Sequence, residues 1–439
     1  MVPGGDGFAR LGDGRVGFAS GALPGDVIHP IEIDDRRSYV RALTWELVES
    51  GPERVQAPCP VADTCGGCDW MHLSREAQLR AKAGVLREAL SRTGGFRELP
   101  EALPVVSAGT DLHYRGRLRV HVDDAGRIGL FARRSHQLIE VPGCPVSLPA
   151  VEQALLVVRE VAARHPGALS ALSAIEMRTA PSGPPLALEL VPRDGHQTLP
   201  ESTAAFRDEL AERFAVGVER EPHARHAPDP GDEQRWPLPG GVELSAPLEA
   251  FTQVNWSVNT EMVRAVLEGA RERGLASFCD LYCGAGNFAL PLLSAGLTGI
   301  GIDREHAGIE AARRSARSAG LPDPGFLPGD VAHRVRALVR KRRRFDLVLL
   351  DPPRSGARDV LPAVADLAPR YVAVCSCDPV TLARDLRVLA RSGYELESVT
   401  GFDMFPHTHH VEALAWMRRK AEGREHAISA WERKPRNNR

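Results

Sequence analysis

The stretch Ser277-Phe-Cys-Asp-Leu-Tyr-Cys-Gly-Ala-Gly-Asn-Phe-Ala-Leu290 carries the pattern that decides the fold. It predicts a strand, a glycine-rich turn at Gly284 and Gly286, and the start of a helix. From Ala276 onward the sequence continues to alternate strand-like and helix-like segments. This alternation predicts an α/β fold with a doubly wound parallel sheet, in which ligands bind outside the carboxyl ends of the strands.

Acidic residues stand at the ends of several predicted strands in this half of the chain. Thr298-Gly-Ile-Gly-Ile-Asp303 predicts a second strand, and its final carboxylate is suitably spaced to accept hydrogen bonds from both ribose hydroxyls of a nucleoside. The pair Gly284 and Gly286 would also suit a dinucleotide, but no third glycine follows at that spacing. Four carboxylates favour a cationic ligand over a pyrophosphate, and the sulfonium S-adenosylmethionine fits. These acids are Asp280, Asp303, Asp330 and Asp351.

A second informative stretch places Cys377 at a predicted corner between a strand and a helix. Tyr371 to Cys375 is a short, largely apolar run typical of a buried strand, and Asp378-Pro379 is a favourable helix start. The partial positive charge of a helix N-terminus favours thiolate over thiol, so Cys377 is a candidate nucleophile. The alternative is that Cys375 and Cys377 are both small buried apolar residues.

Length and composition indicate a globular protein with several domains. A chain of 439 residues is too long for one core, which predicts two or three domains. A formal charge of -2 argues against a surface coated with basic residues, so contacts with nucleic acid would come from local patches. The sequence shows no signal-peptide pattern and no apolar run long enough to span a membrane. We therefore expect a cytoplasmic protein whose eight cysteines remain reduced.

Three thiols lie within ten residues in Cys59-Pro-Val-Ala-Asp-Thr-Cys65-Gly-Gly-Cys68, and Cys144 is a fourth candidate. Four thiolates complete a metal or cluster site. Structural zinc usually uses two C-x2-C knuckles, and the single knuckle here favours an iron-sulfur cluster without deciding the matter. Chance grouping is the alternative.

The segment Tyr114-Arg-Gly-Arg-Leu-Arg-Val-His-Val122 predicts a half-buried strand with one cationic face. Arg115, Arg117 and Arg119 lie on that face, and Arg133 follows on the returning segment. Three arginines on one face could hold several phosphates of a folded RNA, although a merely solvated strand face would show the same pattern.

The sequence divides into four predicted units. Glycine-rich turns between short alternating runs predict a small β-barrel at the N-terminus, and residues 14–27 resemble the TRAM module of RNA-modifying enzymes. An amphipathic helix follows, with Ser74 as its N-cap and Gly94-Gly95 as its stop. A polar, proline-rich stretch over 219–240 marks the last boundary. The units are residues 1–55 (barrel), 56–73 with 105–245 (mixed α+β domain with the cysteines), 74–104 (helix docking on the catalytic domain) and 246–439 (catalytic domain).

Five motifs occur in the order seen in S-adenosylmethionine-dependent RNA uracil-5 methyltransferases. They are Phe251-Thr-Gln-Val-Asn255, Asp280-Leu-Tyr-Cys-Gly-Ala-Gly-Asn-Phe288, Asp351-Pro-Pro-Arg354, Ser376-Cys-Asp-Pro379 and Asp403-Met-Phe-Pro-His-Thr-His-His-Val-Glu412. The chain resembles the branch of that family with a TRAM module and a four-cysteine cluster. The resemblance implies a Rossmann-like class I methyltransferase domain. It also implies an RNA substrate, with 23S ribosomal RNA preferred and the transfer RNA T-loop as alternative. We expect the protein to be a monomer.

The resemblance assigns roles to individual residues. It implies that Cys377 is the nucleophile, that Glu412 is the base, and that a four-iron four-sulfur cluster is held by Cys59, Cys65, Cys68 and Cys144. Asp378 departs from the family, which usually has Asn there, and its carboxylate would tend to raise the pKa of the neighbouring thiol. The implied cofactor contacts are Gln253, Tyr282, Gly284, Asn287, Asp303, Asp330 and Asp351.

The chemistry of uracil explains why such an enzyme needs a thiol and a base. Uracil C5 is too weak a nucleophile to take a methyl group until a thiolate adds to C6, and C5 must afterwards lose its proton. An amino-methyltransferase typically has an aromatic residue where Arg354 stands, and a cytosine-5 enzyme would show a Pro-Cys pair that this chain lacks. A cluster-bearing RNA-binding protein with an inactive catalytic domain would not need an intact Cys377 and Glu412.

Overall fold

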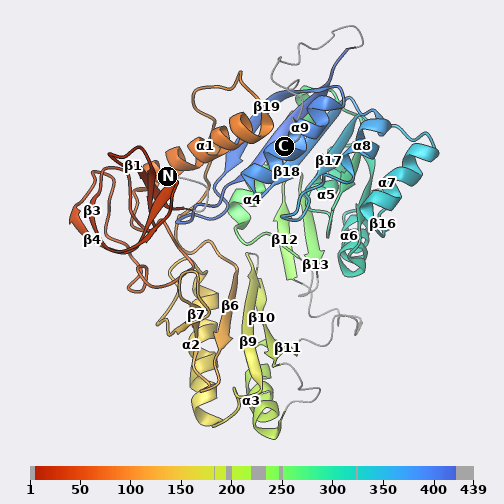
Figure 1. Ribbon diagram of the computed structural model, residues 1–439. Coiled ribbons are helices and arrows are strands. Elements are labelled where there is room, and N and C mark those ends of the chain that lie inside the picture. Colours follow the sequence, from red (N-terminus) through yellow and green to blue (C-terminus); the bar gives the residue numbers. More distant parts are fainter. Residues whose placement is uncertain are drawn as a thin grey trace, which may run out of the picture.

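The computed structural model describes residues 5–181, 183–193, 200–218, 234–246, 251–322 and 325–421 (Figure 1). Most of the predicted boundary stretch, residues 219–233, lies outside the described residues, as does the end of the chain from residue 422. The described helices include none with the length and apolar character needed to cross a membrane.

The catalytic half is built on one eight-stranded sheet. Its strand order is β16-β15-β14-β17-β18-β20-β19-β5. The strands from β16 to β18 are parallel, as predicted, but β20 runs antiparallel to both of its neighbours, so the expectation of an all-parallel sheet is wrong at this edge. The strands are β5 (Val105–Val106), β14 (Ser277–Leu281), β15 (Thr298–Asp303), β16 (Leu327–Pro328), β17 (Leu347–Leu350), β18 (Tyr371–Ser376), β19 (Tyr394–Phe402) and β20 (Glu412–Arg419).

Helices cover both faces of this sheet. Along β17, Leu347 and Leu349 join one hydrophobic cluster, while Val348 and Leu350 join the cluster on the other face. A strand buried on both faces is therefore apolar at every position, which explains the unbroken apolar run in the sequence. One face is covered by α4 (Trp256–Glu272), α5 (Ala289–Ser294) and α6 (His306–Ser318), and the other by α1 (Arg75–Ala89), α7 (Val331–Arg340), α8 (Leu361–Leu367) and α9 (Pro379–Arg391).

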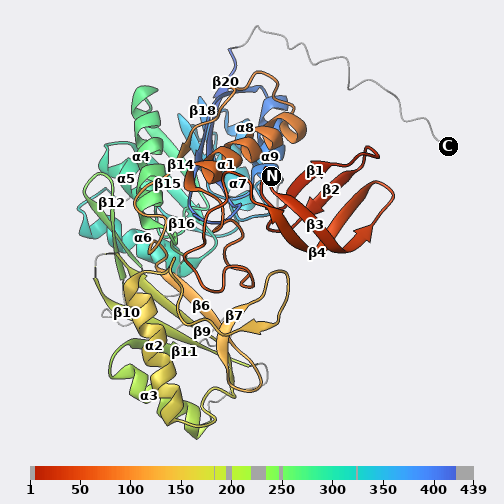
Figure 2. The same cartoon turned by 90° about the vertical axis from the view of Figure 1, so that its left-hand side faces the viewer.

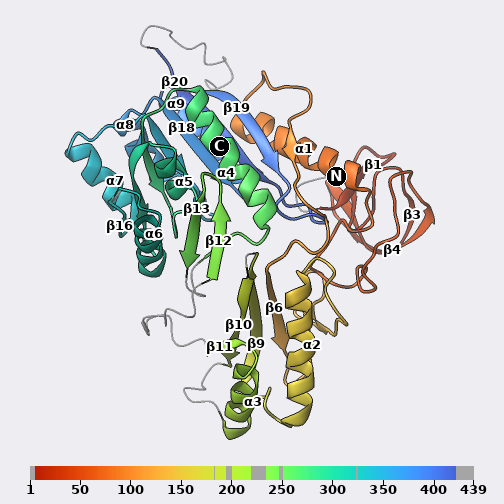
Figure 3. The same ribbon diagram turned by 180° about the vertical axis from the view of Figure 1, so that it is seen from behind.

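Helix α1 reaches the catalytic half although it lies early in the chain. The Ser74 hydroxyl accepts a hydrogen bond from the Ala77 amide at 3.3 Å, so the predicted N-cap is confirmed. After the π-helical turn η1 (Leu90–Gly94), the predicted stop is also confirmed, because Gly95 takes the left-handed conformation that ends the helix. Helix α1 lies beside β19 (Figure 3) and also packs against α9. Strand β5 then pairs with β19 as an edge strand of the sheet.

The described N-terminal strands form a separate four-stranded sheet in the order β1-β2-β4-β3 (Figure 2). Strands β2 and β4 are parallel, whereas the other two pairings are antiparallel. The strands are β1 (Gly7–Arg10), β2 (Val16–Ala19), β3 (Val27–Asp35) and β4 (Tyr39–Glu49).

The central unit is a six-stranded sheet in the order β11-β10-β9-β6-β7-β8, with two helices packed against it. The hairpin of β12 (Gln234–Leu238) and β13 (Val242–Ala246) contributes Trp236 and Leu244 to the hydrophobic core of the catalytic half, so the boundary drawn at 245 falls inside this hairpin. The other elements are β6 (Arg117–Val122), β7 (Ile128–Phe131), β8 (Leu138–Ile139), β9 (Leu172–Ala180), β10 (Gly183–Pro192), β11 (Ala215–Val218), α2 (Pro149–Arg164) and α3 (Glu201–Ala211).

Candidate active site

The predicted corner between strand and helix is present at Cys377. Strand β18 ends at Ser376, and the Asp378 carboxylate caps α9 by accepting a hydrogen bond from the Thr381 amide at 2.6 Å. Cys375 lies inside the strand and is fully buried, whereas Cys377 lies beyond its end and is partly exposed. Of the two thiols, only Cys377 is accessible to a substrate.

Glu412 and Cys377 lie at the same end of two neighbouring strands. Strands β18 and β20 are antiparallel, and their last paired residues are Ser376 and Ala413. Cys377 directly follows Ser376, and Glu412 directly precedes Ala413, so both lie at the same end of this strand pair. The charge of Glu412 acts on the Cys377 thiol, as expected for groups that lie close together. The fold therefore places a thiol and a carboxyl group, far apart in the sequence, at one end of the sheet.

The environment perturbs both groups. Burial, followed by the negative charge of Asp351, raises the pKa of the Glu412 carboxyl to about 8, although Arg354 opposes this shift. Burial, followed by the charge of Glu412, raises the pKa of the Cys377 thiol to about 11. The effect predicted for the helix N-terminus, which favours the thiolate, would oppose these two causes and stays a prediction. Glu412 is the strongest acidic influence on this thiol, and the Asp378 carboxylate is occupied as the helix cap.

Three acids gather beside this pair at the carboxyl ends of β14, β15 and β17. Asp280 is fully buried, and neither of its carboxylate oxygens has a hydrogen-bond partner among the described residues. Burial, with the charges of Asp351 and Asp303, raises its pKa well above the ordinary value. Burial, with the charge of Asp303, raises the pKa of Asp351 to about 7. Buried carboxyl groups in this state suit a positively charged ligand, which matches the sulfonium expected from the sequence.

The turn after β14 shapes the backbone beside these acids. Tyr282, Gly284 and Gly286 all have positive φ angles, of 64°, 51° and 92°. The Gly284 amide donates to the Asp303 carboxylate at 2.9 Å, and the Glu305 amide donates to its other oxygen at 2.8 Å. A Cβ atom at Gly284 would meet no other atom within 4 Å, so this part of the turn borders open space. The left-handed backbone of Tyr282 could not be inferred from its residue type.

The other predicted cofactor residues lie near this turn, but two of them already have partners inside the protein. Asn287 exchanges two side-chain hydrogen bonds with Asn259 of α4, at 2.8 and 2.9 Å. Asp330 caps α7 through the His333 amide at 2.7 Å. Gln253 is partly buried just before α4 begins. Asn259 was missed by the sequence reasoning, because only the fold brings it beside Asn287.

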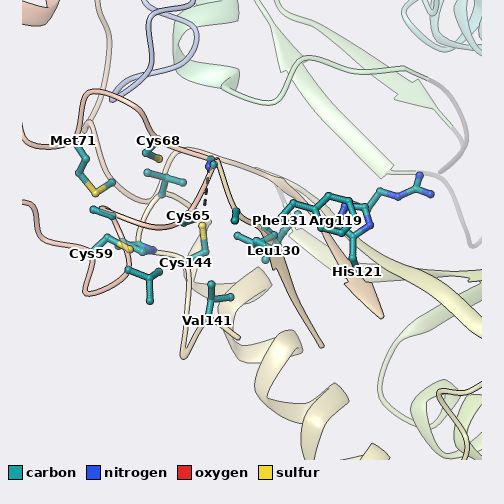
Figure 4. Close-up of a pocket in the computed structure, with 18 of the residues that line it drawn as sticks. Cys59, Cys65, Cys68, Met71, Arg119, His121, Leu130, Phe131, Val141 and Cys144 are labelled. Atoms are coloured by element: carbon teal, nitrogen blue, oxygen red, sulfur yellow. Dashed lines mark hydrogen bonds between the residues drawn. The ribbon is translucent and has the colours of Figure 1, made fainter. Parts of the chain in front are cut away.

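The four predicted metal ligands line one cavity of about 500 Å³ in the central unit, here called the cysteine cavity (Figure 4). Met71 lies beside these thiols, and Phe131 lies farther along the same cavity (Figure 4). Across the described ranges, no three His, Cys, Asp or Glu side chains are grouped closely enough to hold a single metal ion. The cavity is lined by Cys59, Cys65, Cys68 and Cys144 among other residues.

The cationic face of β6 is present, but part of its charge is used inside the protein. Glu176 is almost fully buried and forms an ion pair with Arg117 at 2.7 Å, while Arg119 lies at 3.9 Å and is 44% exposed. Arg115 donates to the Arg117 carbonyl at 2.9 Å. Arg133 donates two long hydrogen bonds, both at 3.5 Å, to main-chain carbonyls of the cysteine loop. Of these four predicted RNA contacts, Arg119 is the best placed to reach a phosphate.

The fold and the cluster of buried carboxyl groups define an S-adenosylmethionine-dependent methyltransferase. Residues 331–420 match the family model for tRNA (uracil-5-)-methyltransferases. An uncharacterized RNA methyltransferase of Gloeobacter violaceus is 34% identical over 95% of both chains. The 23S rRNA (uracil(1939)-C(5))-methyltransferase RlmD of Pectobacterium atrosepticum is 33% identical over 94% of this chain and 91% of its own.

A solved structure agrees over nearly the whole molecule. The Pyrococcus abyssi tRNA (uracil-54, C5)-methyltransferase, in complex with S-adenosyl-L-homocysteine, superposes with a TM-score of 0.71 and is 25% identical, covering 94% of this chain and 100% of that one. The chain belongs to the family of S-adenosylmethionine-dependent RNA uracil-5 methyltransferases.

Proposed function

We propose that this enzyme methylates C5 of a uridine in 23S ribosomal RNA. Support comes from relatives named as 23S rRNA methyltransferases, which are 33–34% identical over 94% of this chain. The transfer RNA T-loop is the second candidate, because the similar Pyrococcus abyssi enzyme is a tRNA (uracil-54, C5)-methyltransferase. The experiment is to map 5-methyluridine in both RNAs from a strain lacking the gene. Loss at a 23S uridine, restored by the gene, supports the proposal. Loss in transfer RNA supports the alternative, and unchanged RNA contradicts both.

The observation that carries the proposed mechanism is that Cys377 and Glu412 lie at the same end of β18 and β20, close enough for the charge of Glu412 to act on the thiol. The Cys377 thiolate adds to C6 of the uracil, which makes C5 nucleophilic enough to take the methyl group. C5 then bears both the methyl group and its original proton. Glu412 removes this proton, the C5–C6 double bond re-forms, and the thiolate leaves. The raised pKa of Glu412 makes it a stronger base near neutral pH than an ordinary carboxylate.

S-adenosylmethionine supplies a methyl group on a positively charged sulfur. The residues best suited to hold it are the three acids at the carboxyl edge, of which Asp280 has no internal hydrogen-bond partner among the described residues. Asp303, fixed by two backbone amides, is suited to the ribose hydroxyls. Tyr282, Gly284 and Gln253 would complete this site. The internal bonds of Asn287 and Asp330 favour supporting roles for these two residues.

For the cysteine cavity we propose a four-iron four-sulfur cluster. The four thiols line one cavity, and a cluster of this kind is held by four cysteine thiolates. A cavity of about 500 Å³ has room for a group larger than a single ion. We also propose that the N-terminal sheet belongs to a TRAM-like barrel and that Arg115 and Arg119 are among the residues that contact RNA. The protein is proposed to act as a monomer in the reducing cytoplasm.

A further inference from the structure

The loop between β19 and β20, residues 403–411, leads directly to Glu412, and buried polar side chains from an early part of the chain hold it. These side chains come from residues 69–82, which span the end of the cysteine loop and the first half of α1. The loop and this early segment are more than 300 residues apart in the sequence. Their contacts are hydrogen bonds and ion pairs, which fix position and direction more narrowly than apolar packing does.

The first of these contacts holds the start of the loop. Lys82 and Asp403 are both fully buried and form an ion pair, and Arg75 pairs with the other oxygen of the same carboxylate. The Lys82 ammonium also donates to the Phe405 carbonyl at 2.9 Å. A buried ammonium group is retained only where it has such partners, so Lys82 fixes two points of the loop at once.

The second contact holds the middle of the loop at His407. The His407 amide donates to the Gln78 side-chain oxygen at 2.9 Å, and the Gln78 amide nitrogen lies 3.2 Å from the His407 ring. The Trp70 amide donates to the His407 carbonyl at 2.9 Å. His407 has a φ of 65°, a conformation that a residue with a side chain keeps only when its surroundings enforce it. The Gln78 side chain is therefore part of what maintains a strained backbone five residues before Glu412.

The third contact holds the end of the loop. The Asp69 carboxylate accepts from the His409 amide at 3.2 Å and lies 2.5 Å from the His409 ring nitrogen. The His410 amide donates to the Thr408 hydroxyl at 3.2 Å, which continues the bonded path to the residues before Glu412. The early segment thus bonds to the start, the middle and the end of the loop, and Val106 and Tyr114 add hydrogen bonds to Asp403 and Pro406.

We propose that Gln78 and Lys82 are positioning residues for the proton abstraction by Glu412. This inference rests on the proposed role of Glu412 as the base. Neither side chain is placed to touch the RNA or the methyl donor, because both are fully buried under the loop. Their loss shifts the loop and with it the carboxyl group, while Cys377, which is held by β18 and α9, remains in place. Only the elimination step should then slow, by roughly 100-fold for a displacement of about 1 Å.

The test measures how the reaction divides between covalent adduct and released product. Gln78→Leu and Lys82→Met enzymes are incubated with substrate RNA and methyl-labelled S-adenosylmethionine. We expect each variant to accumulate a methylated protein–RNA adduct that survives denaturation, with multiple-turnover product formation slowed roughly 100-fold. S-adenosylmethionine binding should stay within about twofold of wild type. Gln153→Leu makes the same change at an exposed position of α2 and should behave as wild type.

The amounts of adduct and product distinguish a positioning role of Gln78 and Lys82 from a general loss of structure in their variants. If adduct and product fall together, or if both variants turn over normally, the inference is overturned. Lys82→Met leaves Asp403 paired only with Arg75 and is the variant more prone to unfold, so Gln78→Leu, which introduces no unpaired charge, keeps the test decisive. Glu412→Gln is run in parallel. If Glu412→Gln forms the adduct but Gln78→Leu does not, the positioning role of Gln78 is refuted and the proposed mechanism stands. If Glu412→Gln forms no adduct, the proposed role of Glu412 as the base is itself refuted.

Discussion

Replacing Glu412 by Gln should make the protein more stable at alkaline pH. In the unfolded chain a glutamate has a pKa of 4.5, and in the folded protein burial and the charge of Asp351 raise the pKa of Glu412 to about 8. Each pH unit of difference corresponds to 1.36 kcal/mol, so ionising this one group lowers the free energy of unfolding by roughly 5 kcal/mol. Gln has nearly the same shape and never ionises.

The direction in which the free energy of unfolding changes with pH follows from proton binding. Between pH 4.5 and 8 the folded protein holds the Glu412 proton more tightly than the unfolded chain does, so wild-type stability falls as the pH rises through this window. Below pH 4.5 the group is neutral in both states and contributes nothing. Above pH 8 the full loss is present. Asp351, whose pKa is raised to about 7, acts in the same direction in both proteins and largely cancels from the comparison.

The assay is urea unfolding at pH values from 5 to 9, followed by tryptophan fluorescence, since Trp416 lies on the same strand as Glu412. The free energy of unfolding of Glu412→Gln minus that of wild type should be near zero at pH 5 and reach several kcal/mol at pH 9. Glu268→Gln, at an exposed position of α4, is the control and should give a flat difference. Parallel curves for Glu412→Gln and wild type would refute the claim that this carboxyl is buried beside another acid.

Three further outcomes follow from the site. Cys377→Ala should abolish methyl transfer, whereas Cys375→Ala should only lower the free energy of unfolding, by about 1 kcal/mol, through lost packing. If the Cys377→Ala enzyme is active and the Cys375→Ala enzyme is not, Cys375 would be the nucleophile. Protein purified without oxygen should contain about four irons per chain, and stoichiometric zinc without iron would exclude a cluster in the cysteine cavity. Arg119→Ser should weaken RNA binding and reduce its salt dependence, and unchanged RNA affinity across a salt series would exclude that contact. Arg117→Ser should instead destabilise the fold by roughly 1–2 kcal/mol, because the buried Glu176 loses one charged partner but keeps Arg178.

Local features of the fold could be predicted because their causes are local. The run over β17 is apolar throughout since both faces of the strand are covered. Ser74, Asp378 and Gly95 were identified as helix ends, because capping depends on the chemistry of one residue and its neighbours within a few positions.

Features that depend on residues distant in the sequence could not be predicted in the same way. The antiparallel direction of β20 is set by how the chain returns across the sheet, and it is this direction that brings Glu412 to the same end of the strand pair as Cys377. The amide pair of Asn259 and Asn287 and the buried carboxylate of Glu176 are likewise products of the three-dimensional fold. The sequence analysis expected a carboxylate to raise the pKa of the Cys377 thiol but attributed this effect to Asp378, whereas burial and Glu412 are the main causes in the folded protein.

The most direct measurement of the mechanism is mass spectrometry of the Glu412→Gln enzyme after incubation with substrate RNA and S-adenosylmethionine. Once Cys377 is a thiolate, addition and methyl transfer need no further base, so the reaction should stop before elimination, about 10² to 10⁴-fold slower in that step than wild type. A peptide containing Cys377 should then carry a methylated uridine nucleotide, and the adduct should be absent when Cys377 is also replaced by Ala. Normal turnover by Glu412→Gln without any adduct would contradict the account, because the proton would then be leaving to another group.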